Sequence, residues 1–247
     1  MKKYFLGTAI NDKKSSDILE MLAQRMASGV TRIFVTPNLD HVVRNYQDEK
    51  LKDLYDRAWL SVNDSKIIPI LALLDGISIK NTTAGSDITK CIFESGMLKD
   101  YRVAVVGCEY ESVDSVMKSW GVQNYRHYNP PMGFIHNQEQ VEACIEFVIN
   151  AQPNITFLCV GSPQQEILAG CIERKSEESG LLMCVGASLD FLSGRQKRAP
   201  FLIQQLCLEW FYRFCLNPRK LAARYFIRCP KVLMLLAVSF YTKHVKK

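Results

Sequence analysis

The sequence lacks the features that mark several large classes of protein. Its 247 residues contain no C-x-x-C pair, and the nine cysteines are scattered and odd in number, which argues against a disulfide framework and a zinc site. No eighteen consecutive apolar residues occur, which by this criterion excludes a membrane-spanning segment. Neither G-x-G-x-x-G nor G-x-x-x-x-G-K-[ST] occurs, so a nicotinamide dinucleotide site or a P-loop is unsupported.

Acidic residues are scarce in the last part of the chain. From Arg195 onward, twelve lysines and arginines stand against one acid, Glu209, which gives a net charge of +11. The first 194 residues hold 19 basic and 24 acidic side chains. Such a basic segment predicts contact with phosphates, whether of a nucleotide, a nucleic acid or an anionic membrane.

The end of this basic segment favours a membrane over a nucleic acid. Val232–Tyr241 is an apolar run of ten residues between Lys231 and the lysines at 243, 246 and 247, a length that suits a helix lying in a membrane interface. No recognisable nucleic-acid-reading module accompanies it. Packing onto a partner subunit of a homo-oligomer is the alternative for this helix.

The beginning of the chain does not resemble a secretory signal. Lys2 and Lys3 are followed by an apolar stretch that is too short and has no small-residue cleavage site. Together with the unpatterned cysteines, this predicts a cytoplasmic location.

Short β-rich runs alternate with helical patterns over the first 194 residues, which is typical of a mainly parallel sheet covered by helices. The runs are rich in Val, Ile, Leu and Phe, as expected for strands buried on both faces. The predicted strands are 32–35, 59–62, 102–106, 155–160 and 181–185, with a weaker one near 122–128. We therefore predict an α/β, Rossmann-like core over 1–194 and a basic, helical C-terminal appendage over 195–247.

Helices are predicted where apolar residues recur near the 3.6-residue period, over 18–26, 39–46 and 141–148. In the appendage, a further amphipathic helix is predicted over 203–214. Asn217 is then predicted to end this helix, and Pro218 to begin a new one. Pro230 predicts a second break.

Three predicted strands end in a glycine, at Gly107, Gly161 and Gly186. In an open parallel sheet, ligands bind beyond the carboxyl ends of the strands, where glycine lets the backbone approach a phosphate. These three glycines are therefore candidate binding positions, and a purely structural turn is the alternative for each.

Two strand-to-helix junctions share one arrangement. Thr36 and Pro37 place a hydroxyl at the predicted cap and a proline at the first helical position, followed by Asn38. In the second junction, Ser162 and Gln165 have the S-x-x-Q spacing of a capping box. Thr36, Asn38 and Gln165 are candidate substrate contacts facing one crevice; helix capping alone is the alternative.

The motifs in these junctions belong to a longer ordered series. The segments are T-P-N-L-D-H at 36–41, A-G-S-D at 84–87, Y-N-P-P-M-G-F at 128–134, G-S-P-Q-Q-E at 161–166, V-G-A-S-L-D-F-L-S-G-R at 185–195, K-R-A-P at 197–200, L-E-W-F-Y-R at 208–213 and N-P-R-K at 217–220. Over roughly residues 5 to 230, the chain resembles the WecG/TagA/CpsF family of bacterial glycosyltransferases.

This resemblance implies transfer of a sugar from a UDP-sugar, with inversion, onto a polyprenyl-diphosphate-linked saccharide. The sugar would be an N-acetylhexosamine, a hexuronic derivative or a hexose, used in cell-surface polysaccharides. The family fold is a Rossmann-like core with an appendage that closes over the active site. The resemblance also implies a peripheral location on the inner face of the bacterial plasma membrane.

Inverting transfer needs a base for the acceptor hydroxyl. The resemblance places it at Asp64, where Asn63 and Ser65 replace the proline and glycine of the family's usual Pro-Asp-Gly turn. A helix N-cap is the alternative role for Asp64. Asp40 and His41 are the rival base; the alternatives are that Asp40 complements a helix dipole and that His41 forms a hydrogen bond in the core.

The sequence contains no D-x-D, so no ligands for a metal clamp on the diphosphate are visible, and we predict a metal-independent reaction without a cofactor. Side-chain cations must then neutralise the phosphates. The candidates are Arg195, Lys197, Arg198, Arg213, Arg219 and Arg224, of which the last three align best with the family's appendage arginines. A solvated helix face is the alternative for each.

Gly85 is the remaining candidate for donor contact. Family members often carry an arginine three residues earlier, where this chain has Thr82, with Lys80 as a substitute. Because of this departure and the altered turn at Asp64, a catalytically idle membrane scaffold with the same fold is the alternative function. The transferred sugar, the acceptor and the oligomeric state stay open.

Overall fold

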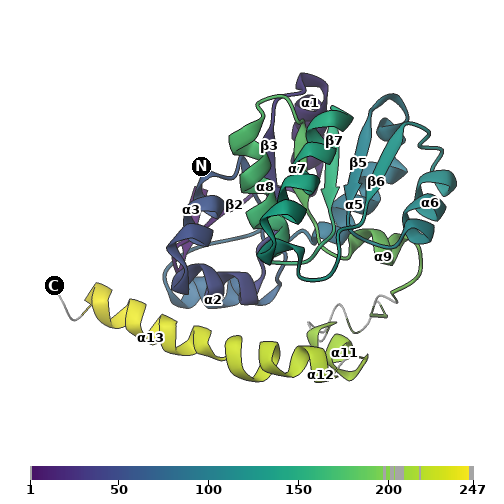
Figure 1. The fold of residues 1–247 in the computed structure, drawn as a ribbon. Helices are drawn as coiled ribbons and strands as arrows, with labels where there is room; N and C mark the ends of the chain where they lie inside the picture. The colour runs from purple at the N-terminus through teal and green to yellow at the C-terminus, as the bar shows by residue number, and fades with distance from the viewer. Residues whose placement is uncertain (1, 197–198, 201–202, 204–208, 217, 245–247) are drawn as a thin grey trace.

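The computed structural model describes residues 2–196, 199–200, 203, 209–216 and 218–244. A six-stranded parallel sheet lies at the centre, helices cover both faces, and the last helix runs along the carboxyl edge of the sheet (Figure 1). In spatial order the strands are β4 (Leu60–Ser61), β3 (Arg32–Val35), β8 (Leu181–Cys184), β7 (Ile155–Leu158), β5 (Val103–Val106) and β6 (Tyr125–Tyr128). The predicted Rossmann-like α/β class is confirmed.

An antiparallel hairpin of β1 (Lys2–Phe5) and β2 (Thr8–Asn11), which the sequence analysis did not predict, lies beside the sheet. The helices are α1 (Ser15–Ser28), α2 (Leu39–Gln47), α3 (Glu49–Arg57), α4 (Ile67–Leu74), α5 (Gly85–Glu94), α6 (Tyr110–Ser119), α7 (Gln138–Ala151), α8 (Gln164–Lys175), α9 (Ser188–Leu192), α11 (Glu209–Leu216), α12 (Pro218–Ala222) and α13 (Lys231–His244). Single turns η1 (Met97–Asp100) and η2 (Phe134–His136) and a π-helical turn η3 (Ala223–Arg228) complete the elements.

The sheet separates two apolar cores because successive strand residues point to opposite faces. On β3, Phe34 packs with α1, α5, α6 and α9, whereas Ile33 and Val35 pack with α3, α7 and α8. Both faces of the sheet are therefore buried at its inner strands, and β5, β7 and β8 are buried at every residue, whereas the edge strand β6 is polar and partly exposed.

A third apolar cluster joins the appendage to the core. Val232 and Leu235 of α13 are buried against residues of the hairpin, α2 and α4, among them Val42 and Ile68. The turn at residues 229–230 confirms the predicted break at Pro230, and α12 begins at Pro218 as predicted. Part of the helix predicted over 203–214, and the break at Asn217, lie outside the described residues.

The prediction that no segment is apolar enough to span a membrane is corrected by the segment Tyr225–Thr242. Among the described residues, this one window of 18 residues, with a mean hydropathy of 1.2 and 11% of it buried, is long and apolar enough to span a membrane by length and composition. The criterion of uninterrupted apolar residues missed it because Arg228 and Lys231 interrupt the run. The buried contacts of Val232 and Leu235 are those of a helix lying along the core.

Asp12, which follows β2, holds the segment that leads toward α5. Its carboxylate accepts hydrogen bonds from the backbone N–H groups of Lys80 and Asn81 and pairs with Lys3 Nζ at 2.7 Å. Burial acts to raise the pKa of Asp12, but the hydrogen bonds from Lys3, Asn81 and Lys80 prevail and lower it from 3.8 to about 2. Because the folded pKa lies below the unfolded one, this stabilisation is present above pH 4 and is lost as the pH falls toward 2.

We expect Asp12→Asn to lower the free energy of unfolding by about 2 kcal/mol at pH 7. The variant should also lose part of the acid dependence of stability between pH 4 and 2. Urea denaturation at a series of pH values measures both effects, with Asp17→Asn on the exposed first turn of α1 as control. An acid dependence identical to that of the wild type would contradict this role.

Candidate functional site

Thr36 and Gly85 meet at the carboxyl edge of the sheet. Thr36 directly follows β3, is buried, and donates from Oγ1 to the carbonyl oxygen of Cys184 at 3.5 Å. A Cβ placed on Gly85 would lie 2.9 Å from Thr36 Oγ1, so only glycine lets α5 begin this close to Thr36. Two predicted contact positions from distant parts of the sequence therefore lie side by side.

The cap of α2 differs from the prediction. Asn38, and not Thr36, is the N-cap: its side chain accepts from Asp40 N at 3.1 Å, and His41 Nδ1 accepts from Asn38 N at 3.3 Å. The expected placement of Pro37 at the first helical position is therefore wrong. Because an asparagine side chain satisfies the free N–H groups as well as a hydroxyl does, the cap moves two residues along and leaves Thr36 directed at the sheet edge.

Asp40 is a buried carboxylate that pairs with two arginines. It is 1% exposed, and its carboxylate pairs with Arg44 of α2 through one oxygen and with Arg228 Nε through the other, the latter at 2.8 Å. Arg228 belongs to η3 in the appendage, so this contact joins the appendage to the T-P-N-L-D-H segment. The sequence analysis did not select Arg228 or Arg44, although the i,i+4 spacing of Asp40 and Arg44 is a signal for their pairing.

Asp64 lies in a turn that Asn63 organises. The buried Asn63 side chain accepts from Ser65 N at 2.9 Å and donates to Thr82 Oγ1 at 2.8 Å. Asp64 itself is half-buried, and its N–H donates to the carbonyl oxygen of Pro37 at 2.9 Å. Two of the departures from the family pattern, Asn63 and Thr82, thus bond to each other, and the third, Ser65, donates its N–H to Asn63.

The N-cap role considered for Asp64 is wrong. Helix α4 begins at Ile67 with Lys66 in the cap position, so Asp64 lies outside the capping residues. Through Pro37, Asp64 is placed next to the segment that holds Thr36 and Asn38.

Gln165 connects two strand-end loops. Its Oε1 accepts from the N–H of Gly186 after β8 at 2.9 Å, and its Nε2 donates to Glu166 Oε1 at 2.9 Å. The expected S-x-x-Q capping box is wrong, because no side chain caps α8 and the amide of Gln165 is used by Gly186 instead. Thr36 thus contacts the last residue of β8, and Gln165 contacts the loop that follows it.

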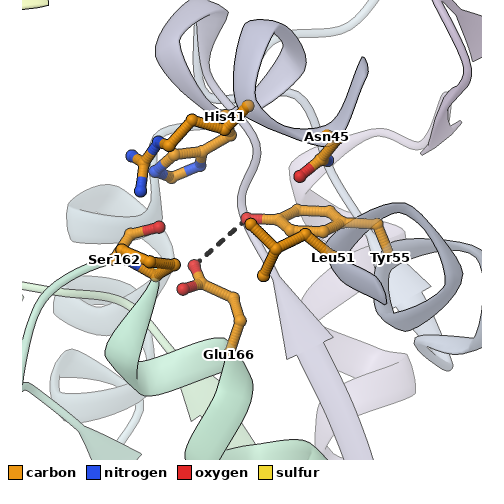
Figure 2. Close-up of a pocket in the computed structure, with 8 residues that line it drawn as sticks. His41, Asn45, Leu51, Tyr55, Ser162 and Glu166 are labelled. Atoms are coloured by element: carbon orange, nitrogen blue, oxygen red, sulfur yellow. Dashed lines mark hydrogen bonds between the residues drawn. The ribbon is translucent and has the colours of Figure 1, made fainter. Parts of the chain in front are cut away.

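Glu166 fixes the orientation of that amide from a buried position. Tyr55 of α3 donates to Glu166 Oε1 at 3.1 Å (Figure 2). Burial raises the pKa of Glu166, and hydrogen bonds from Gln165, Ser162 and Tyr55 act in the opposite direction. Burial together with the nearby Glu166 carboxylate raises the pKa of Tyr55.

A small pocket opens beside this cluster, between α2, α3 and the start of α8 (Figure 2). Its lining consists of His41, Arg44, Asn45, Leu51, Tyr55, Ser162, Pro163 and Glu166. The sequence analysis had placed His41 and Ser162 in separate motifs, and the fold brings both to one pocket.

We expect Gln165→Ala to lower the free energy of unfolding by about 1–3 kcal/mol, because the half-buried Gly186 N–H loses its acceptor and the buried Glu166 loses a donor. Urea denaturation measures this loss. Gln164→Ala, a half-buried neighbour on the same helix, is the matched control. Equal stability of the two variants would contradict the linking role of Gln165.

The strand-end glycines have left-handed backbone angles, which L-residues rarely adopt. The φ values are 95° at Gly107, 80° at Gly161 and 57° at Gly186. At Gly107 a Cβ would also lie 2.8 Å from the backbone of Cys159, whereas the space around Gly161 is open. Gly107 thus has a structural requirement of its own, and Gly161 borders free space at the sheet edge.

The predicted phosphate-binding cations are described only in part. Arg195 follows α9 and Arg219 lies on α12, and both are exposed. Lys197 and Arg198, and the side chains of Arg213 and Arg224, lie outside the described residues. Within the described ranges, no group of three or more His, Cys, Asp or Glu side chains is placed to hold a metal ion.

Comparison with known proteins identifies the family. The model of the Glycosyl transferase WecG/TagA/CpsF family matches residues 3–246. A Bacillus subtilis (strain 168) protein named N-acetylglucosaminyldiphosphoundecaprenol N-acetyl-beta-D-mannosaminyltransferase is 24% identical over 207 residues, which cover 74% of this chain and 79% of that protein. A Staphylococcus aureus (strain NCTC 8325 / PS 47) protein of the same name is 30% identical over 96 residues, or 37% of each chain. The chain belongs to the WecG/TagA/CpsF family of glycosyltransferases.

Proposed function

We propose that this glycosyltransferase moves an N-acetylhexosamine from a UDP-sugar, with inversion, to a polyprenyl-diphosphate-linked saccharide. The observation that carries the proposal is the position of Asp64, half-buried beside the Thr36–Asn38 segment at the carboxyl edge of a parallel sheet. The names of the two relatives, which specify N-acetylmannosaminyl transfer to a lipid-linked N-acetylglucosamine, support this donor and acceptor class.

In the proposed reaction, Asp64 acts as the general base. Its carboxylate takes the proton from the acceptor hydroxyl while the hydroxyl oxygen attacks the anomeric carbon. A new glycosidic C–O bond forms as the bond from that carbon to the diphosphate breaks on the opposite side, and UDP leaves with the electron pair. Attack from the side opposite the leaving group inverts the configuration.

Asp40 and His41 are less suited to this step. Asp40 is held between Arg44 and Arg228, and His41 Nδ1 accepts from the backbone of Asn38. These contacts support a structural role for the pair, in which the T-P-N-L-D-H segment anchors the appendage.

The appendage supplies the cations for the leaving diphosphate. Arg228 already brings the appendage to the core, and Arg213, Arg219 and Arg224 lie on the same segment. Arginine forms bidentate contacts with phosphate oxygens and can stabilise the developing charge without a divalent ion. The basic segment and the exposed face of α13 also support a peripheral location on the inner face of the plasma membrane.

The test is a UDP-release assay. Purified protein is given UDP-N-acetylmannosamine, UDP-N-acetylglucosamine and other UDP-sugars, with a short-chain lipid-diphosphate N-acetylglucosamine acceptor and liposomes. We expect turnover with a UDP-N-acetylhexosamine that depends on the acceptor. Absence of turnover with every donor, from folded protein, would favour the catalytically idle membrane scaffold, in which Asp64→Asn leaves the biological output unchanged.

A further inference from the structure

Helix α4 exposes an apolar stripe on the core. The helix has the sequence I-I-P-I-L-A-L-L, without a polar residue, and Ile70, Leu73 and Leu74 are 61%, 68% and 68% exposed. These residues have i, i+3 and i+4 spacing and therefore form one continuous stripe. Ile68, Leu71 and Ala72 fill the core from the opposite side of the helix, so the exposed stripe is not needed for packing.

The last helix of the appendage lies beside α4. Helix α13 buries Val232 and Leu235 in the same cluster that holds the inner side of α4, and Ser239 Oγ donates to Asp75 Oδ1, at the end of α4, at 2.9 Å. The remaining face of α13 exposes Leu233, Met234, Val238, Phe240 and Tyr241. The two helices are thus neighbours, and each has an outward-facing apolar side.

We propose that α4 is a second bilayer-contact element, built into the core, which seats the candidate base at the level of the lipid headgroups. This inference rests on the proposed function, because the bilayer is chosen as the occupant for its lipid-linked acceptor. Exposed apolar surface of this kind marks an interaction site. Exposed Lys66 precedes the helix and exposed Lys80 follows it, and both can meet anionic headgroups. Of the nearby acids, Asp75 accepts from Ser239, and Asp12 pairs with Lys3 and accepts from the backbone of Lys80.

The position of α4 in the chain gives the contact a role in catalysis. Asp64 lies three residues before the first residue of α4, and the turn around Asp64 is fixed by Asn63. A bilayer that receives the stripe therefore has Asp64 close to its surface. The diphosphate of a polyprenyl-linked acceptor lies at the same level, with its first sugar just outside.

The test compares two double variants in vesicles of phosphatidylglycerol and phosphatidylethanolamine. Leu73→Gln with Leu74→Gln removes the apolar contact, and Leu73→Met with Leu74→Met keeps it at the same positions. We expect the glutamine variant to lose about tenfold or more in vesicle partitioning by flotation, and the methionine variant to match the wild type. Circular dichroism of both variants should match the wild type.

Turnover separates this inference from the proposed function. The glutamine variant should keep wild-type turnover with a water-soluble short-chain acceptor and lose it with a vesicle-embedded one. If the wild type turns over no donor while flotation still distinguishes the variants, the proposed function fails and the bilayer contact stands.

A Leu74→Trp variant gives a direct readout of insertion. Its added fluorescence should be quenched by brominated lipids in the same vesicles. Wild-type flotation of the glutamine variant, or absence of quenching at position 74, would overturn the inference. A glutamine variant that floats normally but changes from dimer to monomer would assign the stripe to a second copy of the chain.

Discussion

Replacing Asp64 with asparagine is expected to lower kcat by about 10²- to 10⁴-fold, the usual contribution of a general base. The KM for the donor should change little, because the amide retains the shape of the side chain and the turn is held by Asn63. Steady-state UDP release measures both constants. The pH profile of the remaining activity should lose its acidic limb.

Asp100→Asn is the matched control for this substitution. Asp100 is an exposed carboxylate in η1, which precedes β5 and therefore lies toward the opposite edge of the sheet. It should leave kcat unchanged. Full activity of the Asp64 variant would show that Asp64 is not the base. Asp40 and His41 would then be the remaining candidates.

Replacing Asp40 with asparagine is expected to lower the free energy of unfolding by about 3 kcal/mol and to release the appendage. The loss is large because Asp40 is buried and its neutralisation leaves the mostly buried Arg44 without a counter-charge, whereas the 43% exposed Arg228 is solvated by water. Urea denaturation measures the stability, and limited trypsin digestion measures how readily the chain is cut between α11 and α13. Arg228→Gln should release the appendage with a smaller loss of stability, since Arg44 still pairs with Asp40.

Glu49→Gln provides the control, because Glu49 forms an exposed ion pair with Lys52 in an i,i+3 arrangement. Pairs of this kind contribute about 0.5 kcal/mol or less. An Asp40 variant with wild-type stability and digestion, but with the acidic limb of its pH profile lost, would identify Asp40 as the base and contradict its role as an anchor.

The inner strands of the sheet could be predicted from the sequence because they are mostly apolar, whereas the polar edge strand β6 gave a weaker signal. Strand β3 was predicted with its observed bounds, 32–35, because a run buried on both faces is continuously apolar. The hairpin of β1 and β2 was missed, since Lys2 and Lys3 mask the alternation. The apolar stretch of α4 was missed because eight residues with a proline show no clear period.

The site could be predicted at the level of motifs but not of contacts. Thr36, Gly85 and Gln165 do gather at one edge, because parallel strands bring their carboxyl ends together. The caps were misassigned at both junctions, since several side chains near a helix start can satisfy the same N–H groups. The pairing of Arg228 with Asp40 depends on how the appendage folds back, and spacing alone gives no signal for it.

Isothermal titration calorimetry of UDP binding tests the central claim most directly, namely that appendage arginines neutralise the diphosphate without a metal. The wild type is compared with a variant carrying Arg213→Gln, Arg219→Gln and Arg224→Gln, in EDTA and in Mg²⁺. Lys243→Gln, Lys246→Gln and Lys247→Gln together provide a control with the same change in net charge. The prediction is equal wild-type affinity in both buffers and a loss of about tenfold or more in the arginine variant alone. Binding that requires Mg²⁺ or Mn²⁺, or that is unchanged in the arginine variant, would contradict the claim.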